Sequence, residues 1–315
     1  MSEPAFSIVI ATYQAAGTVA RSVESALAQT YPAHEVIVVD DGSTDQPEEA
    51  LRPFLDRIEL IRKENGGGAS ALNAGMEAAT GEFLAILDAD DAYHPRRLEV
   101  LAKLARERPD LDLITTDAAF LVGDETVGRF GEYTPFVEED QRAAIFESCF
   151  VGGWPAIRLD PLREAGGFDE GLRTGYDWEC WARLILRGSR AGFVEEPFYL
   201  YRLHAGTLTS SRASSLWDRV ALLEKCGREP SLDDEERAAL ERALRVHRSR
   251  AVEAEAQDSV YGSAPRSPLL RRSIMAGVQP RARLAALATA VAPPLARRLV
   301  REYQPAEDRL GAEGP

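Results

Sequence analysis

The chain has 315 residues, of which 45% are hydrophobic and 28% charged, and its formal net charge is −14 at pH 7. This composition is typical of an ordinary globular protein that is long enough for one large domain with an appendage, or for two domains. The negative charge excludes nucleic acid as a general partner, because a phosphate backbone requires a basic surface.

The charge is distributed unevenly along the chain. Residues 266–303 hold eight arginines and a single acid, Glu302, whereas the rest is strongly acidic. No stretch reaches the roughly 20 apolar residues that a membrane-spanning helix needs. The three cysteines are widely spaced and odd in number, which excludes a closed disulfide framework and favours a reducing compartment. Residues 1–6 lack the layout of a signal peptide, so we expect a cytoplasmic protein.

Strand and helix patterns alternate at the start of the chain. Residues 6–11 and 35–39 are apolar runs of strand length, with a helical pattern at 18–29 between them. A weaker helix and a strand at 58–61 follow. Consecutive strands joined through helices form parallel sheets with right-handed crossovers. The sequence therefore predicts an α/β fold with a mostly parallel sheet.

Three glycines at 66–68 precede a helix predicted at 71–79. Their backbone N–H groups could bind a phosphate, although a flexible connection explains them equally well. Their spacing matches neither the Gly-x-Gly-x-x-Gly fingerprint of dinucleotide-binding folds nor a Walker loop. This weighs against a dehydrogenase and against a P-loop enzyme.

The most informative stretch is a buried strand predicted at 83–87 together with the acids that follow it. Asp88, Asp90 and Asp91 place three carboxylates within four positions. Asp88 and Asp90 share strand parity, so they point the same way if the strand continues. Carboxylates this close are best tolerated with a divalent cation or a ligand's donors between them. Open α/β sheets bind ligands at the carboxyl ends of their strands, which favours a binding site over a solvated acidic turn.

The second half of the chain shows weaker patterns. The predicted elements are a helix from 95 to about 107, a strand at 111–116, strands near 120 and 127, a helix near 139–147, a helix opening near 176, and short strands at 193–194 and 198–201. Asp177 and Glu179 lie in the first turn of their helix, either as partners of the helix dipole or as a proton acceptor. His204 is either a surface residue or a ligand for a metal or phosphate.

From residue 211 onward, helical spacing predicts a basic helical extension over 211–315, after a first domain over 1–210. Arginines of 266–303 alternate with Leu, Ala and Val. This segment could lie on an anionic membrane face, or it could pack on the protein's own acidic surface. The sequence leaves both interpretations open.

Seven motifs follow one another along the chain. They are Ser-Ile-Val-Ile-Ala-Thr-Tyr at 7–13, Asp-Asp-Gly-Ser-Thr-Asp at 40–45, Asn-Gly-Gly at 65–67 with Ala-Leu-Asn-Ala-Gly at 71–75, Leu-Asp-Ala-Asp-Asp at 87–91, Gly-Gly-Phe-Asp at 166–169, Tyr-Asp-Trp-Glu at 176–179 and Tyr-Arg-Leu-His at 201–204. Together, over roughly residues 5–210, they resemble the family 2 glycosyltransferases of the GT-A fold. Three positions depart from the family pattern: Gln14 stands where Asn is common, Leu72 where Arg is common and Tyr176 where Glu is common.

The resemblance implies a Rossmann-like GT-A domain that transfers a sugar, with inversion, from a nucleotide donor to a hydroxyl of a glycan or lipid-linked acceptor, aided by Mn²⁺ or Mg²⁺. By position in the motifs it implies the following roles: Ala11, Thr12, Tyr13, Asp41, Asn73 and Asp88 bind the nucleotide sugar, Asp90 and His204 bind the metal, and Asp177 is the general base with Glu179 as second candidate. A carboxylate at Asp41 suits a UDP-sugar, because it can accept the N–H of the uracil ring.

Two other functions are alternatives to glycosyl transfer. A non-catalytic nucleotide-sugar sensor or scaffold on the same fold should lack some of the acids, yet Asp41, Asp90 and Asp177 are all present. A nucleotidyltransferase should carry a basic, glycine-rich loop after the first strand, and residues 11–17 contain no basic residue. Glycosyl transfer is therefore the preferred interpretation.

Overall fold

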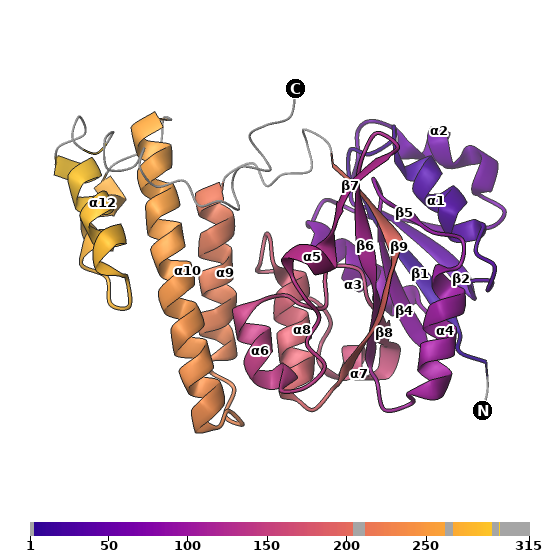
Figure 1. Ribbon diagram of the computed structural model, residues 1–315. Helices are drawn as coiled ribbons and strands as arrows, with labels where there is room; N and C mark the ends of the chain where they lie inside the picture. Colours follow the sequence, from indigo (N-terminus) through magenta and orange to yellow (C-terminus); the bar gives the residue numbers. More distant parts are fainter. Residues whose placement is uncertain (1–2, 204–211, 262–266, 292–295, 297–315) are drawn as a thin grey trace. The chain divides into compact units, whose positions relative to one another are not determined.

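The computed structural model describes residues 3–203, 212–261, 267–291 and 296 (Figure 1). The chain divides into two compact units. The first unit comprises residues 1–208 and 228–236, and the second comprises 209–227 and 237–315. The first division lies beside the domain boundary expected at 210/211, whereas the sequence carried no signal for the return of 228–236 to the first unit.

A mixed sheet forms the centre of the first unit. Within the described residues it has nine strands in the order β3-β2-β1-β4-β8-β6-β9-β5, with β7 paired to β6. The strands are β1 (Phe6–Thr12), β2 (Glu35–Asp40), β3 (Glu59–Arg62), β4 (Phe83–Asp88), β5 (Ala92–Tyr93), β6 (Leu113–Val122), β7 (Glu125–Arg129), β8 (Ala156–Arg158) and β9 (Ala191–Arg202). The four strands from β3 to β4 are parallel, which confirms the predicted α/β fold.

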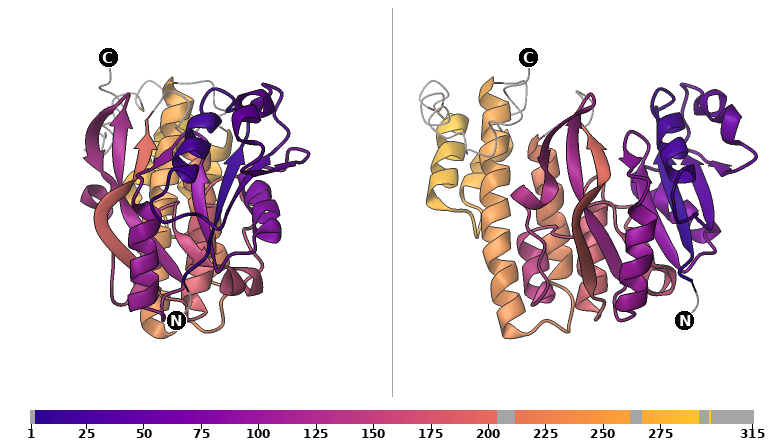
Figure 2. Two further views of the ribbon diagram at one scale, coloured as in Figure 1. Left: turned by 90° about the vertical axis from the view of Figure 1, so that its right-hand side faces the viewer. Right: turned by 45° about the vertical axis from the view of Figure 1, so that its right-hand side comes forward.

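Helices cover both faces of this sheet (Figure 2). Those of the first unit are α1 (Val19–Leu27), α2 (Pro47–Leu51), the 3₁₀ helix η1 (Arg52–Phe54), α3 (Gly68–Ala78), α4 (Arg97–Glu107), α5 (Phe130–Tyr133), α6 (Gln141–Glu147), α7 (Leu159–Glu164) and α8 (Tyr176–Leu186). The alternation along β1 shows how the two faces are filled. Ile8 and Ile10 join a core that includes α1 and α4, while Val9 points to α3. A Cβ on Gly75 would lie 2.3 Å from Val9, so α3 packs directly on the strand.

The sheet differs from the prediction in its second half. β6 and β9 are each one long strand where two short ones were predicted, and they pair in parallel with bulges near Asp117. β8 lies between β4 and β6 and is antiparallel to both. Because β8 has three residues and β5 has two, neither is long enough to produce a recognisable periodicity. Helix α4 begins at Arg97, two residues later than the Pro95 predicted.

The second unit is helical. Its helices are α9 (Arg212–Cys226), α10 (Asp234–Tyr261), whose first turn belongs to the first unit, α11 (Ser267–Ser273) and α12 (Pro280–Val291). Val252 of α10, Leu269 of α11 and Ala282 of α12 share one buried cluster. None of the helices within the described ranges has both the length and the apolar content needed to cross a bilayer.

Candidate active site

The predicted nucleotide-binding residues gather where the central parallel strands end. In the β1–β4 ladder Ala11 is the direct partner of Asp88, and in the β1–β2 ladder Thr12 is the partner of Asp40. Asp41 follows immediately, and its backbone N–H donates to the Thr12 carbonyl at 2.9 Å. The register of three strands therefore brings these residues together at the carboxyl ends of the strands.

Asp177 lies close to the acidic end of β4. The pKa of Asp88 is raised to about 7, first by burial and then by the negative charges of Asp90 and Asp177. Solvent reaches the Asp88 side chain, so water offsets part of the burial, whereas the repulsion among the three carboxylates remains. The first turn of α8 thus adds an acid to the two at the end of β4, although 87 positions separate Asp90 from Asp177 in the sequence.

The third acid of the motif, Asp91, has a structural role. Its buried carboxylate accepts hydrogen bonds from the Tyr199 hydroxyl and the Arg202 backbone N–H, both at 2.8 Å. Burial is the main cause that raises the pKa of Asp91 to about 8, followed by the charge of Asp88. The Tyr199 oxygen also accepts the backbone N–H of Asp88 at 3.2 Å. Asp91 and Tyr199 therefore hold β9 against the end of β4.

The predicted metal ligand His204 lies outside the described residues, so its role stays a prediction. Among the residues that the structure does describe, no three His, Cys, Asp or Glu side chains form a ready cation site. Asp88 and Asp90 still offer a fitting donor set, because Mg²⁺ is usually held by one or two carboxylates plus water and substrate phosphates. The repulsion among Asp88, Asp90 and Asp177 is the observation that favours a cation at the end of β4.

Asp41 binds the glycine-rich loop. Its buried carboxylate accepts the backbone N–H groups of Gly66 at 3.0 Å and Gly67 at 2.7 Å, and it forms an ion pair with Lys63 at 2.8 Å. Those N–H groups, considered above as phosphate donors, are used within the protein. The predicted contact between Asp41 and a base is untested, and what the structure shows is a carboxylate that shapes the loop.

Gln14 lies two residues after β1 and is one of the three positions that depart from the family pattern. Gln14 adopts a left-handed conformation with φ 52°, and its side chain binds the backbone N–H and the hydroxyl of Thr44, both at 3.0 Å. It thereby ties the end of β1 to the loop after β2. Beside it, Tyr13 is exposed, and the buried Thr12 hydroxyl has no hydrogen-bond partner among the described residues. Buried hydroxyls are usually satisfied, so a bound ligand is a natural partner for Thr12.

Asn73 holds the Gly-Gly-Phe-Asp segment. Its amide nitrogen donates to the Phe168 carbonyl and to Glu170, both at 2.9 Å, and its amide oxygen accepts the Phe168 N–H at 2.8 Å. Both amide donors are thus used within the protein. The structure shows a positioning role for Asn73, and its expected contact with the donor sugar stays a prediction.

Glu179, the second candidate for the base, is buried in an ion pair, and its catalytic role stays a prediction. It is 1% exposed and forms an ion pair with Arg183, with oxygen–nitrogen distances of 2.9 and 3.1 Å. Arg183 in turn donates to the carbonyls of Ala165 and Gly167. The carboxylate of Glu179 therefore anchors an arginine that holds the 165–167 turn.

Tyr176 lies beside Asp177 and Asp88. Burial and the charges of these two acids raise the pKa of its phenol far above the usual value, so the hydroxyl stays neutral. A Cβ on Gly68 would lie 2.4 Å from the Tyr176 oxygen, so the ring occupies the space that this glycine leaves at the start of α3. Tyr176 therefore places a neutral phenol at the position where Glu is common in the family pattern.

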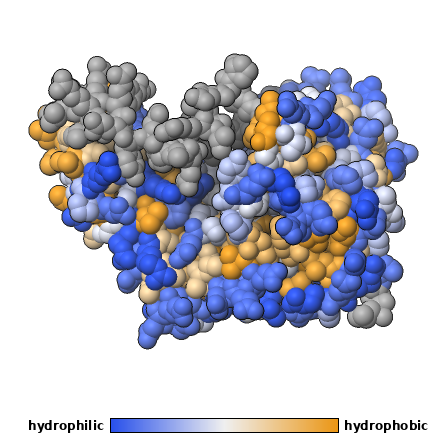
Figure 3. All heavy atoms as spheres, viewed as in Figure 1, coloured by the Kyte–Doolittle hydropathy of each residue, from blue (hydrophilic) through white to orange (hydrophobic). Residues whose placement is uncertain are grey.

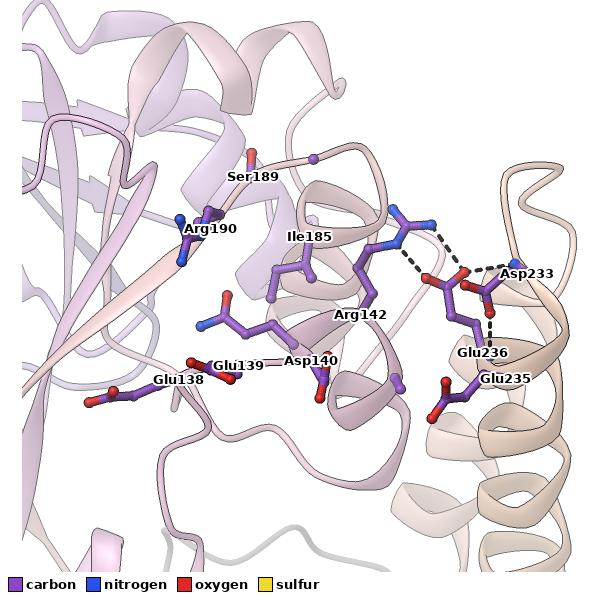
Figure 4. A pocket seen from close by; sticks show the side chains of 13 residues that line it. Glu138, Glu139, Asp140, Arg142, Ile185, Ser189, Arg190, Asp233, Glu235 and Glu236 are labelled. Carbon is purple, nitrogen blue, oxygen red and sulfur yellow. Dashed lines mark hydrogen bonds and ion pairs between the residues drawn. The ribbon is translucent and has the colours of Figure 1, made fainter.

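The first unit also contains a cavity of about 570 Å³ that includes none of the predicted site residues. Figure 4 shows its lining, in which six acids outnumber two arginines. Arg142 of α6 forms an ion pair with Glu236 at 2.5 Å, and Glu236 accepts the Asp233 N–H at 2.9 Å. These contacts hold residues 228–236 within the first unit. We therefore assign the lining of this cavity a structural role.

The fold is an α/β fold with acids at the carboxyl ends of its central parallel strands. Solved structures share this fold. The crystal structure of S. aureus TarS 1–349 in complex with UDP superposes with a TM-score of 0.63 over 96% of this chain and 93% of that one, at 19% identity. The mannosyltransferase PcManGT from Pyrobaculum calidifontis, in complex with GDP-Man and Mn²⁺, gives 0.60 over 100% and 89%, at 20% identity. This chain spans 55% of a longer TarS structure.

The family follows from sequence comparison. The model of glycosyl transferase family 2 matches residues 7–166. An uncharacterized glycosyltransferase of Rickettsia typhi is 31% identical over 229 residues, which cover 70% of each chain. The chain belongs to glycosyl transferase family 2, and it is a glycosyltransferase.

Proposed function

We propose that this glycosyltransferase moves a sugar, with inversion, from a nucleoside diphosphate donor, preferentially a UDP-sugar, to a hydroxyl of a glycan or lipid-linked acceptor. The observation that carries the proposal is that the charges of Asp90 and of Asp177, in the first turn of α8, act on the Asp88 carboxyl at the end of β4. The UDP and GDP-Man complexes of TarS and PcManGT, which share this fold, support a nucleotide donor.

Inversion in a single displacement requires one base on the side of the sugar opposite the leaving group. We assign that role to Asp177, whose carboxylate takes the proton of the acceptor hydroxyl as the oxygen bonds to the anomeric carbon. The bond from that carbon to the diphosphate breaks, and the nucleoside diphosphate leaves with the electron pair. The neutral phenol of Tyr176 cannot compete for this proton, because its raised pKa keeps it protonated.

A divalent cation fits the acids at the end of β4. Asp90, with Asp88 beside it, would hold Mn²⁺ or Mg²⁺, and the His204 contribution is part of this proposal. When bound, such an ion neutralises the charge of a departing diphosphate. The protein's own acidic residues cannot neutralise that negative charge. The Mn²⁺ in the PcManGT complex supports a divalent cation in this protein.

Release of nucleoside diphosphate tests the proposal. The full-length protein is incubated with UDP-sugars and GDP-mannose, with and without Mn²⁺, and the liberated UDP or GDP is measured. We expect Mn²⁺-dependent release with at least one donor. A sensor would release none, and a nucleotidyltransferase would consume the donor only when pyrophosphate is supplied.

Calorimetry tests the metal assignment separately. We expect Asp90→Ala to abolish the Mn²⁺-dependent part of donor binding, whereas Asp56→Ala, at an exposed acid between η1 and β3, should leave it intact. Equal Mn²⁺-dependent binding by both variants would remove Asp90 from the site.

A further inference from the structure

Helix α12 of the second unit has its larger apolar side chains on the outside. The face packed into the unit carries Ala282, Ala286 and Thr289, all fully buried. The opposite face carries Leu284, Leu287 and Val291, which are 53%, 43% and 70% exposed. At 3.6 residues per turn the three exposed residues lie within about 60° of one another. A helix of a water-soluble protein normally turns its leucines inward, so this arrangement requires an explanation.

The neighbouring helix repeats the pattern. Leu269 of α11 is buried in the cluster shared with α12, whereas Leu270 is 54% exposed and Ile274, just after the helix, is 79% exposed. Figure 3 shows hydrophobic residues in orange at the left edge of the molecule, where Figure 1 draws α12. We call Leu270, Ile274, Leu284, Leu287 and Val291 the α11–α12 apolar surface. Several large apolar side chains exposed on two neighbouring helices are a common feature of interaction sites.

The charge around this surface is opposite to that of the protein. Residues 267–291 contain four arginines and no acid, within a chain of net charge −14. Arg272 and Arg283 are used internally: Arg272 stacks on Trp217, and Arg283 donates to the carbonyl of Met275. Arg271 is exposed and follows Leu270 in the chain, whereas Arg281 is exposed but also interacts with Glu253 of α10. Apolar side chains flanked by exposed arginines match the interface of an anionic bilayer.

We propose that the α11–α12 apolar surface docks the enzyme on an anionic lipid membrane. Leucine, isoleucine and valine side chains would enter the boundary between headgroups and acyl chains, while Arg271 faces lipid phosphates. A second copy of this chain is the less favoured occupant, because identical surfaces with net positive charge repel. Such docking would give the enzyme access to a lipid-linked acceptor, but it does not depend on the identity of the donor.

Vesicle co-sedimentation of the full-length protein tests this proposal. Wild-type protein is mixed with vesicles of phosphatidylcholine alone or of phosphatidylcholine with phosphatidylglycerol. We expect about tenfold or greater partitioning onto the anionic vesicles, since each basic residue near such a surface contributes about 1 kcal/mol and tenfold corresponds to 1.4 kcal/mol. The double variant Leu284→Glu/Leu287→Glu should lose at least tenfold of that partitioning.

The control variant Leu55→Glu/Val127→Glu adds the same charge at two exposed apolar residues of the first unit. It should bind vesicles as the wild type does. Equal binding by the two double variants, or no binding by the wild type, would overturn the proposal. A dimer in light scattering that dissociates in Leu284→Glu/Leu287→Glu would assign the surface to a second copy instead. A large loss of thermal stability in that variant alone would assign it to packing within the chain.

The donor assay separates this proposal from the proposed function. The Leu284→Glu/Leu287→Glu variant should release nucleoside diphosphate from a water-soluble donor at the wild-type rate. An enzyme without release activity could still bind vesicles, and a protein that stays in the supernatant could still be a glycosyltransferase.

Discussion

Asp177 is the residue on which the proposed chemistry depends, and its replacement gives the first prediction. Asp177→Asn keeps the shape of the side chain but cannot accept a proton. General-base catalysis contributes roughly 10²–10⁴-fold, so turnover should fall by that factor, or about 3–5 kcal/mol in the barrier. Donor affinity should change little, because Asp177 is assigned to the acceptor hydroxyl. Initial rates and donor titrations measure the two effects separately.

Glu179→Gln is the matched control for that variant, two positions further along the same helix. It removes the charge partner of Arg183, which is itself largely buried. Loss of one partner of a buried ion pair costs about 3 kcal/mol or more, so the thermal midpoint should fall clearly. Turnover of the folded protein should stay within tenfold of wild type. If Glu179→Gln lost activity as Asp177→Asn does while keeping its stability, the base would be Glu179.

At the scale of elements, the turn between α7 and α8 is held by contacts from α3 and α8. Gly166 and Gly167 both have positive φ, 91° and 68°, but only one of them is enclosed. A Cβ at Gly167 would lie 2.5 Å from the Asn73 amide oxygen and 2.9 Å from Met76, whereas nothing lies within 4 Å of a Cβ at Gly166. A side chain at Gly166 would therefore strain the backbone alone, whereas a side chain at Gly167 would also displace Asn73.

This contrast gives the second prediction. Gly166→Ala should cost about 1–2 kcal/mol, the strain of a side chain at positive φ. Gly167→Ala should cost at least about 2 kcal/mol more, because Asn73 then loses hydrogen bonds to Phe168. Urea unfolding of the two variants measures the difference. Equal losses would show that Asn73 does not hold the turn.

The elements also show what the sequence could predict. Apolar runs of strand length identified β1, β2 and β4, and the acids after Leu87 lie at the carboxyl edge of the parallel strands. The sequence does not predict β8, because three residues are too few to show a periodicity. The contacts of Asp41, Asn73 and Glu179 were unpredictable for a different reason. Each depends on partners brought close by tertiary folding, or on a degree of burial that residue type alone does not reveal.

At the scale of the whole molecule, the two units should respond differently to acid, and this is the third prediction. Burial, with help from the charges of Arg219 and Arg250, lowers the pKa of His247 in the second unit from 6.5 to about 4. Between pH 6.5 and 4 the unfolded chain therefore binds the proton and the folded chain does not, so folding stability falls as pH falls. The full loss is about 3 kcal/mol. Urea unfolding at pH 7 and at pH 4.5 should show a smaller pH-dependent loss of stability for His247→Gln than for wild type. If His247→Gln were as acid-sensitive as wild type, carboxylates elsewhere would have to account for the second unit's response to acid.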